Sequence, residues 1–208
     1  MSADAAGVAL GYEPLAEDLR REGRVWVPAG GSHVLPGVGA PLKAALIAAI
    51  VEGWPRKDVR VVLLGEEMGA LRPRARAALC AQVGFLPAGG GLLSNLNGWE
   101  NIALPIGYHA PGKAQGLASR VYALLEQFGA NAQALLAKLP EDMTAFERTL
   151  TGYVRMRLGR PSLVLAEDPG GGPGGPGRRL AAGFAAAYLA DCLQGTFVQL
   201  EDAAGAAR

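Results

Sequence analysis

The chain has 208 residues, of which half are hydrophobic, and its formal net charge at pH 7 is +1. This length suits one well-buried domain and is short for two, and a charge near zero gives no reason to expect nucleic acid or an anionic surface as a partner. No apolar run reaches the roughly 18 residues that span a bilayer. Because the N-terminal stretch MSADAAGVAL also lacks the charged start and apolar core of a signal peptide, we expect a cytoplasmic protein.

The cysteines and histidines offer little metal or redox chemistry. Cys80 and Cys192 lie far apart without CxxC spacing, which is typical of structural thiols. His33 and His109 are isolated, whereas a zinc site needs about four closely spaced ligands. The sequence therefore predicts no metal site.

The N-terminal half is predicted to be built from short strands and two helices. Residues 16–22 are charged and read as helical or irregular, and residues 28–32 read as a turn. A strand, a glycine-containing loop and a helix are expected over 34–51, closed by Gly53 and Pro55. Apolar or alternating runs predict further strands at 8–12, 24–27, 59–64 and 83–86 and a helix at 71–81.

The C-terminal half is predicted to be mostly helical. Two stretches have loop composition, 110–116 and the glycine- and proline-rich 170–177. Strands are expected at 162–166 and 196–200, and helices at 117–128, 132–138, 146–158 and 179–193. The helix over 146–158 carries Arg148, Arg155 and Arg157, which we interpret as a solvated basic face.

Residues 37–44, G-V-G-A-P-L-K-A, partly match the phosphate-binding pattern G-x-x-x-x-G-K-[ST]. Gly37 and Lys43 stand at two of its positions, with Gly39 between them. Leu42 replaces the second glycine, Ala44 cannot offer the hydroxyl that holds magnesium, and Pro41 lacks one amide of the cradle. Without other support for the motif, a simpler explanation is that Lys43 is an ordinary solvated lysine at the start of a helix.

Two acids follow the apolar strand predicted at 162–166. Glu167 and Asp168 come directly after it and precede Pro169. Acids delivered at the carboxyl end of a buried strand are how nucleotide-hydrolysing α/β folds place magnesium and water chemistry. They are therefore the candidate catalytic residues.

The stretch between these motifs carries the most specific resemblance. It contains a glycine hinge at 89–91 and the pattern WEN-x-ALP from Trp99 to Pro105. With the register of the motifs over 30–169, about two-thirds of the chain, it resembles the ATPase subunits of ABC transporters, most of all those of bacterial lipid transporters of the Mla/Mce type. The resemblance implies an α/β, P-loop NTPase-like ABC ATPase fold with a RecA-like core sheet, an antiparallel β subdomain and a small helical subdomain. It implies a single domain over 1–208, with core and β subdomain at 1–98 and 155–208 and helical subdomain at 99–154.

Measured against this family, the chain departs at most catalytic positions. The glutamine that ends the family's strand is Ala88, and the acidic pair is inverted to Glu167-Asp168. The histidine after the last strand falls near Glu201 or Asp202, an acid where the resemblance implies the γ-phosphate. Tyr12 is the candidate for the adenine-stacking aromatic. The family's glycine-containing signature is replaced by Met143, Thr144, Ala145, Phe146 and Glu147.

These departures favour a chain that keeps the ATPase fold but lacks most of the catalytic residues. Loss of one preorganised electrostatic group commonly lowers a rate by about 10²–10³, and several are altered here. The resemblance then implies a pseudo-ATPase, structural or regulatory, peripheral on the cytoplasmic side of the inner membrane in a lipid transporter. No cofactor is expected, and ATP with magnesium would bind weakly. The alternatives are a slow or divergent ATPase that uses Lys43, Glu167 and Asp168, and a soluble α/β domain without a transporter partner.

The partners implied are an integral-membrane permease and a second ATPase subunit, in a homodimer or a heterodimer. No nucleic acid is expected. The family contacts its permease near the segment after the 83–86 strand, so the candidate contact residues are Gly89, Leu92, Leu93, Trp99, Glu100 and Asn101.

Overall fold

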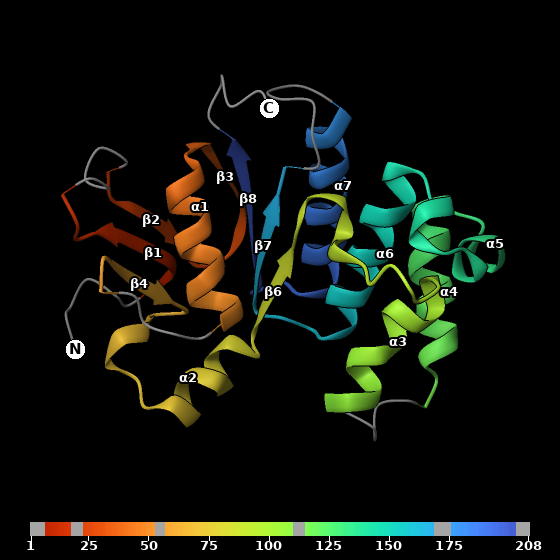
Figure 1. The fold of residues 1–208 in the computed structure, drawn as a ribbon, viewed down its shortest axis with the longest axis horizontal. Coiled ribbons are helices and arrows are strands. Elements are labelled where there is room, and N and C mark those ends of the chain that lie inside the picture. Colours follow the sequence, from red (N-terminus) through yellow and green to blue (C-terminus); the bar gives the residue numbers. More distant parts are fainter. Residues whose placement is uncertain (1–6, 18–22, 53–56, 110–114, 169–175, 203–208) are drawn as a thin grey trace. The chain divides into compact units, whose positions relative to one another are not determined.

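The computed structural model describes residues 7–17, 23–52, 57–109, 115–168 and 176–202 (Figure 1). The chain forms two compact units, one of Met1–Phe85 with Pro161–Arg208 and one of Leu86–Arg160. The second unit is wider at both ends than the helical subdomain predicted at 99–154. Each unit is described separately below.

The first unit contains a four-stranded antiparallel sheet. Its order is β2-β1-β4-β5, with β1 at Val8–Pro14, β2 at Val25–Pro28, β4 at Val59–Leu63 and β5 at Glu66–Glu67. The predicted strands at 8–12, 24–27 and 59–64 are thus confirmed. A 3₁₀ turn, Met68–Ala70, and helix α2, Pro73–Cys80, follow, and Pro73 is tolerated because first-turn amides have no partner within the helix.

A row of alternating charges crosses this sheet. Glu13 on β1 pairs with Arg24, next to β2, and with Arg60 on β4, whose guanidinium nitrogen Nη1 lies 3.4 Å from a Glu13 oxygen. Arg60 also donates to Glu67 on β5 at 2.9 Å, and this hydrogen bond is the main reason that the pKa of Arg60 is raised. Opposite charges on neighbouring strands stabilise one pairing register.

The first unit also contains a four-stranded sheet in the order β3-β8-β7-β6. These strands are β3 at Gly31–Val38, β8 at Thr196–Asp202, β7 at Leu163–Glu167 and β6 at Val83–Leu86. β8 pairs in parallel with both β3 and β7. Helix α1, Ala40–Ile47, continues into a π-helical turn at Ala48–Glu52, and helix α7 spans Pro176–Asp191.

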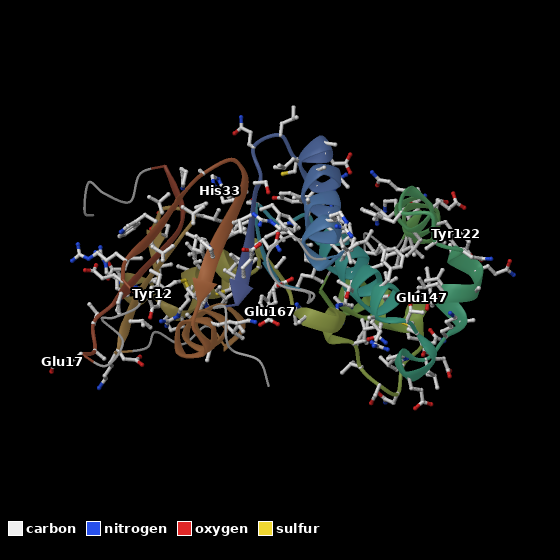
Figure 2. The ribbon with its side chains drawn as sticks, turned by 90° about the horizontal axis from the view of Figure 1, so that it is seen from above. Tyr12, Glu17, His33, Tyr122, Glu147 and Glu167 are labelled. Carbon is white, nitrogen blue, oxygen red and sulfur yellow. The ribbon has the colours of Figure 1, made fainter. Side chains whose placement is uncertain are left out.

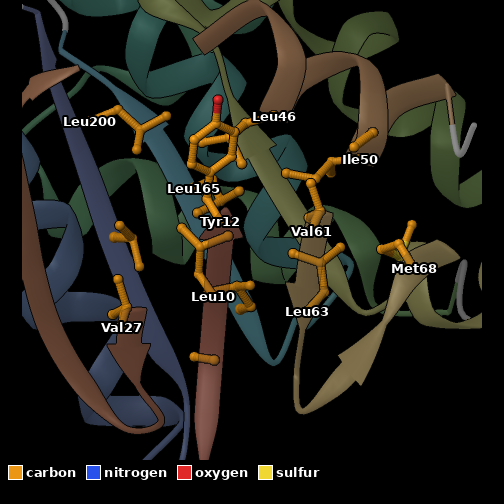
Figure 3. Packing of buried hydrophobic residues seen from close by; sticks show 14 of the residues in the cluster. Leu10, Tyr12, Val27, Leu46, Ile50, Val61, Leu63, Met68, Leu165 and Leu200 are labelled. Atoms are coloured by element: carbon orange, nitrogen blue, oxygen red, sulfur yellow. The ribbon is translucent and has the colours of Figure 1, made fainter. Parts of the chain in front are cut away.

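Successive residues of β8 face opposite sides of the parallel sheet. Phe197 packs on Tyr188 of α7, with ring centroids 6.1 Å apart. Val198 and Leu200 lie in the main core with Leu46 of α1. Figure 3 shows this core, in which side chains of the antiparallel sheet, of α1 and of β7 and β8 pack together. The sheet therefore has an α1 face and an α7 face.

The second unit is helical. It holds a 3₁₀ segment η5 at Ala88–Gly91, α3 at Gly98–His109, α4 at Leu117–Gln127, α5 at Ala132–Ala137, a 3₁₀ turn at Pro140–Asp142 and α6 at Ala145–Leu158. Tyr153 of α6 is fully buried and meets Phe128 edge to face, with centroids 5.5 Å apart. The helices predicted at 117–128, 132–138 and 146–158 are confirmed within a residue or two.

The interpretation of the α6 arginines as a solvated face is wrong. Arg157 is only 7% exposed, and burial lowers the pKa of Arg155. Arg148 donates to the carbonyl oxygen of Met143. Arginine is accommodated in such places because its planar fork of donors can satisfy backbone carbonyls while its stem packs on apolar neighbours.

Some predictions fall outside the described residues. These include the helix end at Gly53 and Pro55, most of the charged stretch 16–22 and most of the two loop stretches. Within the described ranges, no helix combines the length and apolar character needed to cross a bilayer.

Candidate functional site

The stretch that matches the phosphate-binding pattern has almost no loop. Strand β3 runs to Val38, which pairs with Asp202 after a register shift between Leu35 and Val38, and α1 begins at Ala40. Only Gly39 separates strand from helix, and the amide of Lys43 already donates to its carbonyl oxygen at 3.0 Å, as in a regular helix. A phosphate cradle requires several loop amides that point into a common cavity. The backbone here does not provide that arrangement.

Lys43 makes an ion pair with Glu167. The lysine Nζ lies 3.2 Å from a Glu167 oxygen, and the two side chains are only 17% and 13% exposed. Glu167, labelled in Figure 2, is the last residue of β7. Because Glu167 pairs in register with Leu200, it lies on the α1 face of the sheet, where α1 presents Lys43. The structure thus brings these two predicted site residues together.

The other acids at this sheet edge have different surroundings. Asp168 is 9% exposed, and its amide donates to the Leu200 carbonyl oxygen at 3.0 Å. Glu201 follows Leu200 and therefore lies on the α7 face, where its carboxylate is 3.3 Å from the Arg178 guanidinium. Among the described residues, no group of three or more histidines, cysteines or acids could hold a metal ion.

Tyr12, the candidate adenine-stacking residue, lies within the core. Its side chain is 0% exposed and belongs to the hydrophobic cluster shown in Figure 3. Stacking on a base requires a ring face that is open to the ligand. The buried ring of Tyr12 contributes to packing between β1 and α1 instead.

The stretch aligned with the family signature, 143–147, forms the capped start of α6. Thr144 accepts a hydrogen bond from the Glu147 amide at 3.2 Å, and the Glu147 carboxylate accepts from the Thr144 amide at 2.8 Å. Lys138 pairs with the same carboxylate at 2.6 Å. This is a capping box, so two amides that a helix start could offer to a phosphate are bound instead by the chain's own Glu147 and Thr144 side chains (Glu147 is labelled in Figure 2).

The remaining residues of 143–147 divide between core and surface. Met143 is 3% exposed, whereas Phe146, in the first turn of α6, is 38% exposed. Ala145 is the first residue of α6. The capping box could have been found from the sequence, because T-x-x-E before an apolar run is its known signature.

Neutralising Glu147 should weaken α6 in a pH-dependent way. The hydrogen bond from Lys138, and then that from the Thr144 amide, lowers the pKa of Glu147 from its ordinary value of 4.5. A lowered folded-state pKa adds stability that is complete above the ordinary pKa and is lost as the pH falls through the folded-state pKa. We expect Glu147→Gln to cost about 1 kcal/mol near neutral pH. In urea unfolding, this difference from the native chain should shrink as the pH falls through the lowered pKa of Glu147, whereas Glu141→Gln, at an exposed site, should have little effect.

The predicted contact segment is held in place by Asn101, which is 1% exposed. Its side chain accepts from the Leu93 amide at 2.8 Å and donates to the carbonyl oxygens of Leu93, Leu96 and Asn97. Asn97 and Glu100 form a second capping box, with both hydrogen bonds at 2.9 Å. Two residues of the WEN pattern thus have structural roles: Asn101 fixes the loop backbone, and Glu100 caps the start of α3.

The other predicted contact residues vary in exposure. Leu93 is 49% exposed and Glu100 and Gly89 are also exposed, whereas Leu92 and Trp99 are half-buried. Asn101 therefore supports the segment from within, and Leu93 is its most exposed apolar side chain. The sequence signal for the second capping box was N-x-x-E at 97–100.

Comparisons with known proteins agree with this fold. No protein-family model matches the chain. It is 34% identical over 112 residues to the lipoprotein-releasing system ATP-binding protein LolD of Shewanella denitrificans, covering 53% of this chain and 47% of that protein. It is 30% identical over 146 residues to the ABC transporter ATP-binding protein YbbA of Escherichia coli K12, covering 70% and 63%. The chain thus spans about half to two-thirds of the length of these relatives.

A solved structure supports the fold over nearly the whole chain. The structure of cbiO1 from Clostridium perfringens, described as part of the ABC transporter complex cbiONQ, matches with a TM-score of 0.68 and 11% identity. The match covers 94% of this chain and 79% of that one. At this identity the likeness shows the fold alone.

Proposed function

We propose that this chain, which is related in sequence and fold to the ATP-binding subunits of ABC transporters, is a catalytically degenerate subunit with a structural or regulatory role in a transporter complex. The predicted setting is the cytoplasmic side of a bacterial inner membrane, and the predicted cargo is lipid, of the Mla/Mce kind. The LolD relative, named for lipoprotein release, supports a lipid-related cargo.

The ion pair of Lys43 with Glu167 is the observation that carries this proposal. In a phosphate-binding loop the lysine contacts the terminal phosphates, but here a carboxylate of the same chain lies 3.2 Å from it. The single-residue connection at Gly39 removes the cradle, and Ala44 offers no magnesium ligand. The residues present therefore do not fit ATP with magnesium.

The proposed partners follow from the fold and the relatives. An integral-membrane permease would contact the exposed part of the segment 89–101, with Leu93 as its most exposed apolar side chain. A second ATP-binding subunit would pair with this chain as a homodimer or heterodimer. Burial of such an exposed apolar side chain against a partner favours association.

A slow or divergent ATPase is the alternative. It is favoured by the convergence of Lys43 and Glu167, with Asp168 next along the chain, at the carboxyl edge of the parallel sheet. Ligands of open α/β sheets bind at this edge. Nucleotide binding separates the two functions.

Isothermal titration calorimetry with ATP and magnesium tests the proposal. We expect no binding heat up to about 1 mM ATP, corresponding to less than about 4 kcal/mol of binding free energy. Phosphate release should not exceed that of Lys43→Ala. Micromolar binding that is lost in Lys43→Ala would overturn the proposal and leave a regulatory nucleotide site or slow turnover, which phosphate release above that of Lys43→Ala would identify as turnover.

Membrane recruitment tests the structural role separately. In cells that make the native transporter, we expect the tagged chain to be in the membrane fraction, and Lys43→Ala to be recruited equally. Recruitment that requires Lys43 would contradict a nucleotide-independent role.

A further inference from the structure

The backbone of η5 lies in direct contact with the backbone of α6. A Cβ atom added to Gly152 would lie 2.4 Å from the Gly90 carbonyl oxygen and 2.5 Å from the Gly90 Cα. One added to Gly90 would lie 2.1 Å from the Arg148 carbonyl oxygen. Only glycine at both positions permits this approach, as in helix interfaces built on small residues.

Arg155 stabilises the same contact between η5 and α6. Its Nη2 donates to the Gly90 carbonyl oxygen at 2.8 Å, and it is partly buried there, which lowers its pKa. Arg148, Gly152 and Arg155 recur at spacings of four and three residues, so they share one face of α6. This face meets η5, and a charge-assisted hydrogen bond to a shielded carbonyl is among the stronger kinds.

The other end of the segment is fixed by Asn101. Its four hydrogen bonds to the backbone at residues 93–97 span the loop between η5 and α3. A loop held at both ends by buried groups has few conformations left to lose when a partner binds. Between the two anchors, Leu93 is 49% exposed.

We propose that residues 88–101 form a presentation loop, a pre-formed surface loop that opens only together with α6, with Arg155 as its positioning residue. The loop is then ordered without a partner, and a partner seated on Leu93 acts directly on α6. That consequence for a permease rests on the proposed function, whereas the cooperative unit of loop and α6 does not.

Hydrogen exchange of the full chain tests this proposal. Segments that open together exchange with the same free energy and the same urea dependence. We expect this match between the amides of 88–98 and those of 149–156 in the native chain. Fast, independent exchange of the loop beside a protected α6 would overturn the proposal.

Variants separate the positioning role from general destabilisation. Gly152→Ala should speed loop exchange on the order of tenfold or more, whereas Gly107→Ala, in α3 where an added Cβ meets nothing within 4 Å, should not. Arg155→Gln adds no bulk but removes the hydrogen bond that links the loop to α6. In this variant the loop should open separately, so loop exchange should be about tenfold faster with little change in the middle of α6. Arg155→Lys should restore part of the protection of the loop amides.

If Gly152→Ala fails to fold, Arg155→Gln still tests whether α6 holds the loop in place. Unchanged loop exchange in this variant would overturn the role of Arg155. Neither nucleotide nor partner takes part in these measurements, so this inference and the proposed function can fail separately.

Discussion

Replacing Gly90 with alanine should destabilise the helical unit by about 2–5 kcal/mol. The residue has φ of +82°, which costs a residue with a side chain about 1–2 kcal/mol. The new methyl group would also overlap the Arg148 carbonyl oxygen, at 2.1 Å. Because that oxygen belongs to helix backbone, the overlap can be relieved only by moving η5 away from α6, and overpacking of this kind adds roughly 1–3 kcal/mol.

Gly89→Ala is the matched control. Gly89 has a similar φ of +74°, but an added Cβ there meets nothing within 4 Å. It should therefore show the backbone cost alone, about 1–2 kcal/mol. Urea unfolding by circular dichroism, combined with exchange of α6 amides, measures both variants. Equal losses at the two positions would mean that the contact with α6 contributes nothing.

Replacing Glu167 with alanine should destabilise the first unit by about 2 kcal/mol. The change removes the Glu167 carboxylate that lies 3.2 Å from the Lys43 ammonium, a side chain that is only 17% exposed. Removing one partner of a fully buried pair costs about 3–5 kcal/mol, and the partial exposure here reduces that figure. Replacing both residues, in Lys43→Met with Glu167→Leu, should recover most of the loss because an apolar pair needs no charge compensation.

Glu201→Ala serves as the comparison for Glu167→Ala. Its partner Arg178 is 44% exposed and can turn to water, so the loss should stay below about 1 kcal/mol. Thermal unfolding at low and moderate salt measures all three variants. A larger loss for Glu201→Ala than for Glu167→Ala would contradict the assignment of the Lys43 pair as the more shielded one.

Much of the fold could be predicted because the local patterns are strong. The strand predicted at 83–86 has the same bounds in the structure, and the buried strand at 162–166 differs by one residue. Apolar runs bounded by glycine and proline report burial and chain reversal directly. The family resemblance supplied the division into a core sheet, an antiparallel sheet and a helical part, which such patterns do not contain.

The site could not be predicted to the same extent, because its features depend on distant pairings. Which face of the sheet Glu167 occupies is set by its register with Leu200, and no local pattern gives that register. The contact of Gly90 with Gly152 joins residues far apart in the sequence. Arg155 looked like a surface residue because its charge is visible in the sequence, whereas the carbonyl that it binds is not.

The single-residue connection at Gly39 also bears on how this chain can change over evolutionary time. Substitutions at Leu42 and Ala44 could introduce the missing glycine and hydroxyl of the phosphate-binding pattern one at a time. They would not lengthen the connection, because the flanking residues are already committed to β3 and to α1. Recovering a cradle would require strand pairing at Val38 and the first turn of α1 to be given up together, before any phosphate contact compensates. Point substitution alone therefore offers no gradual route to a phosphate cradle at this connection.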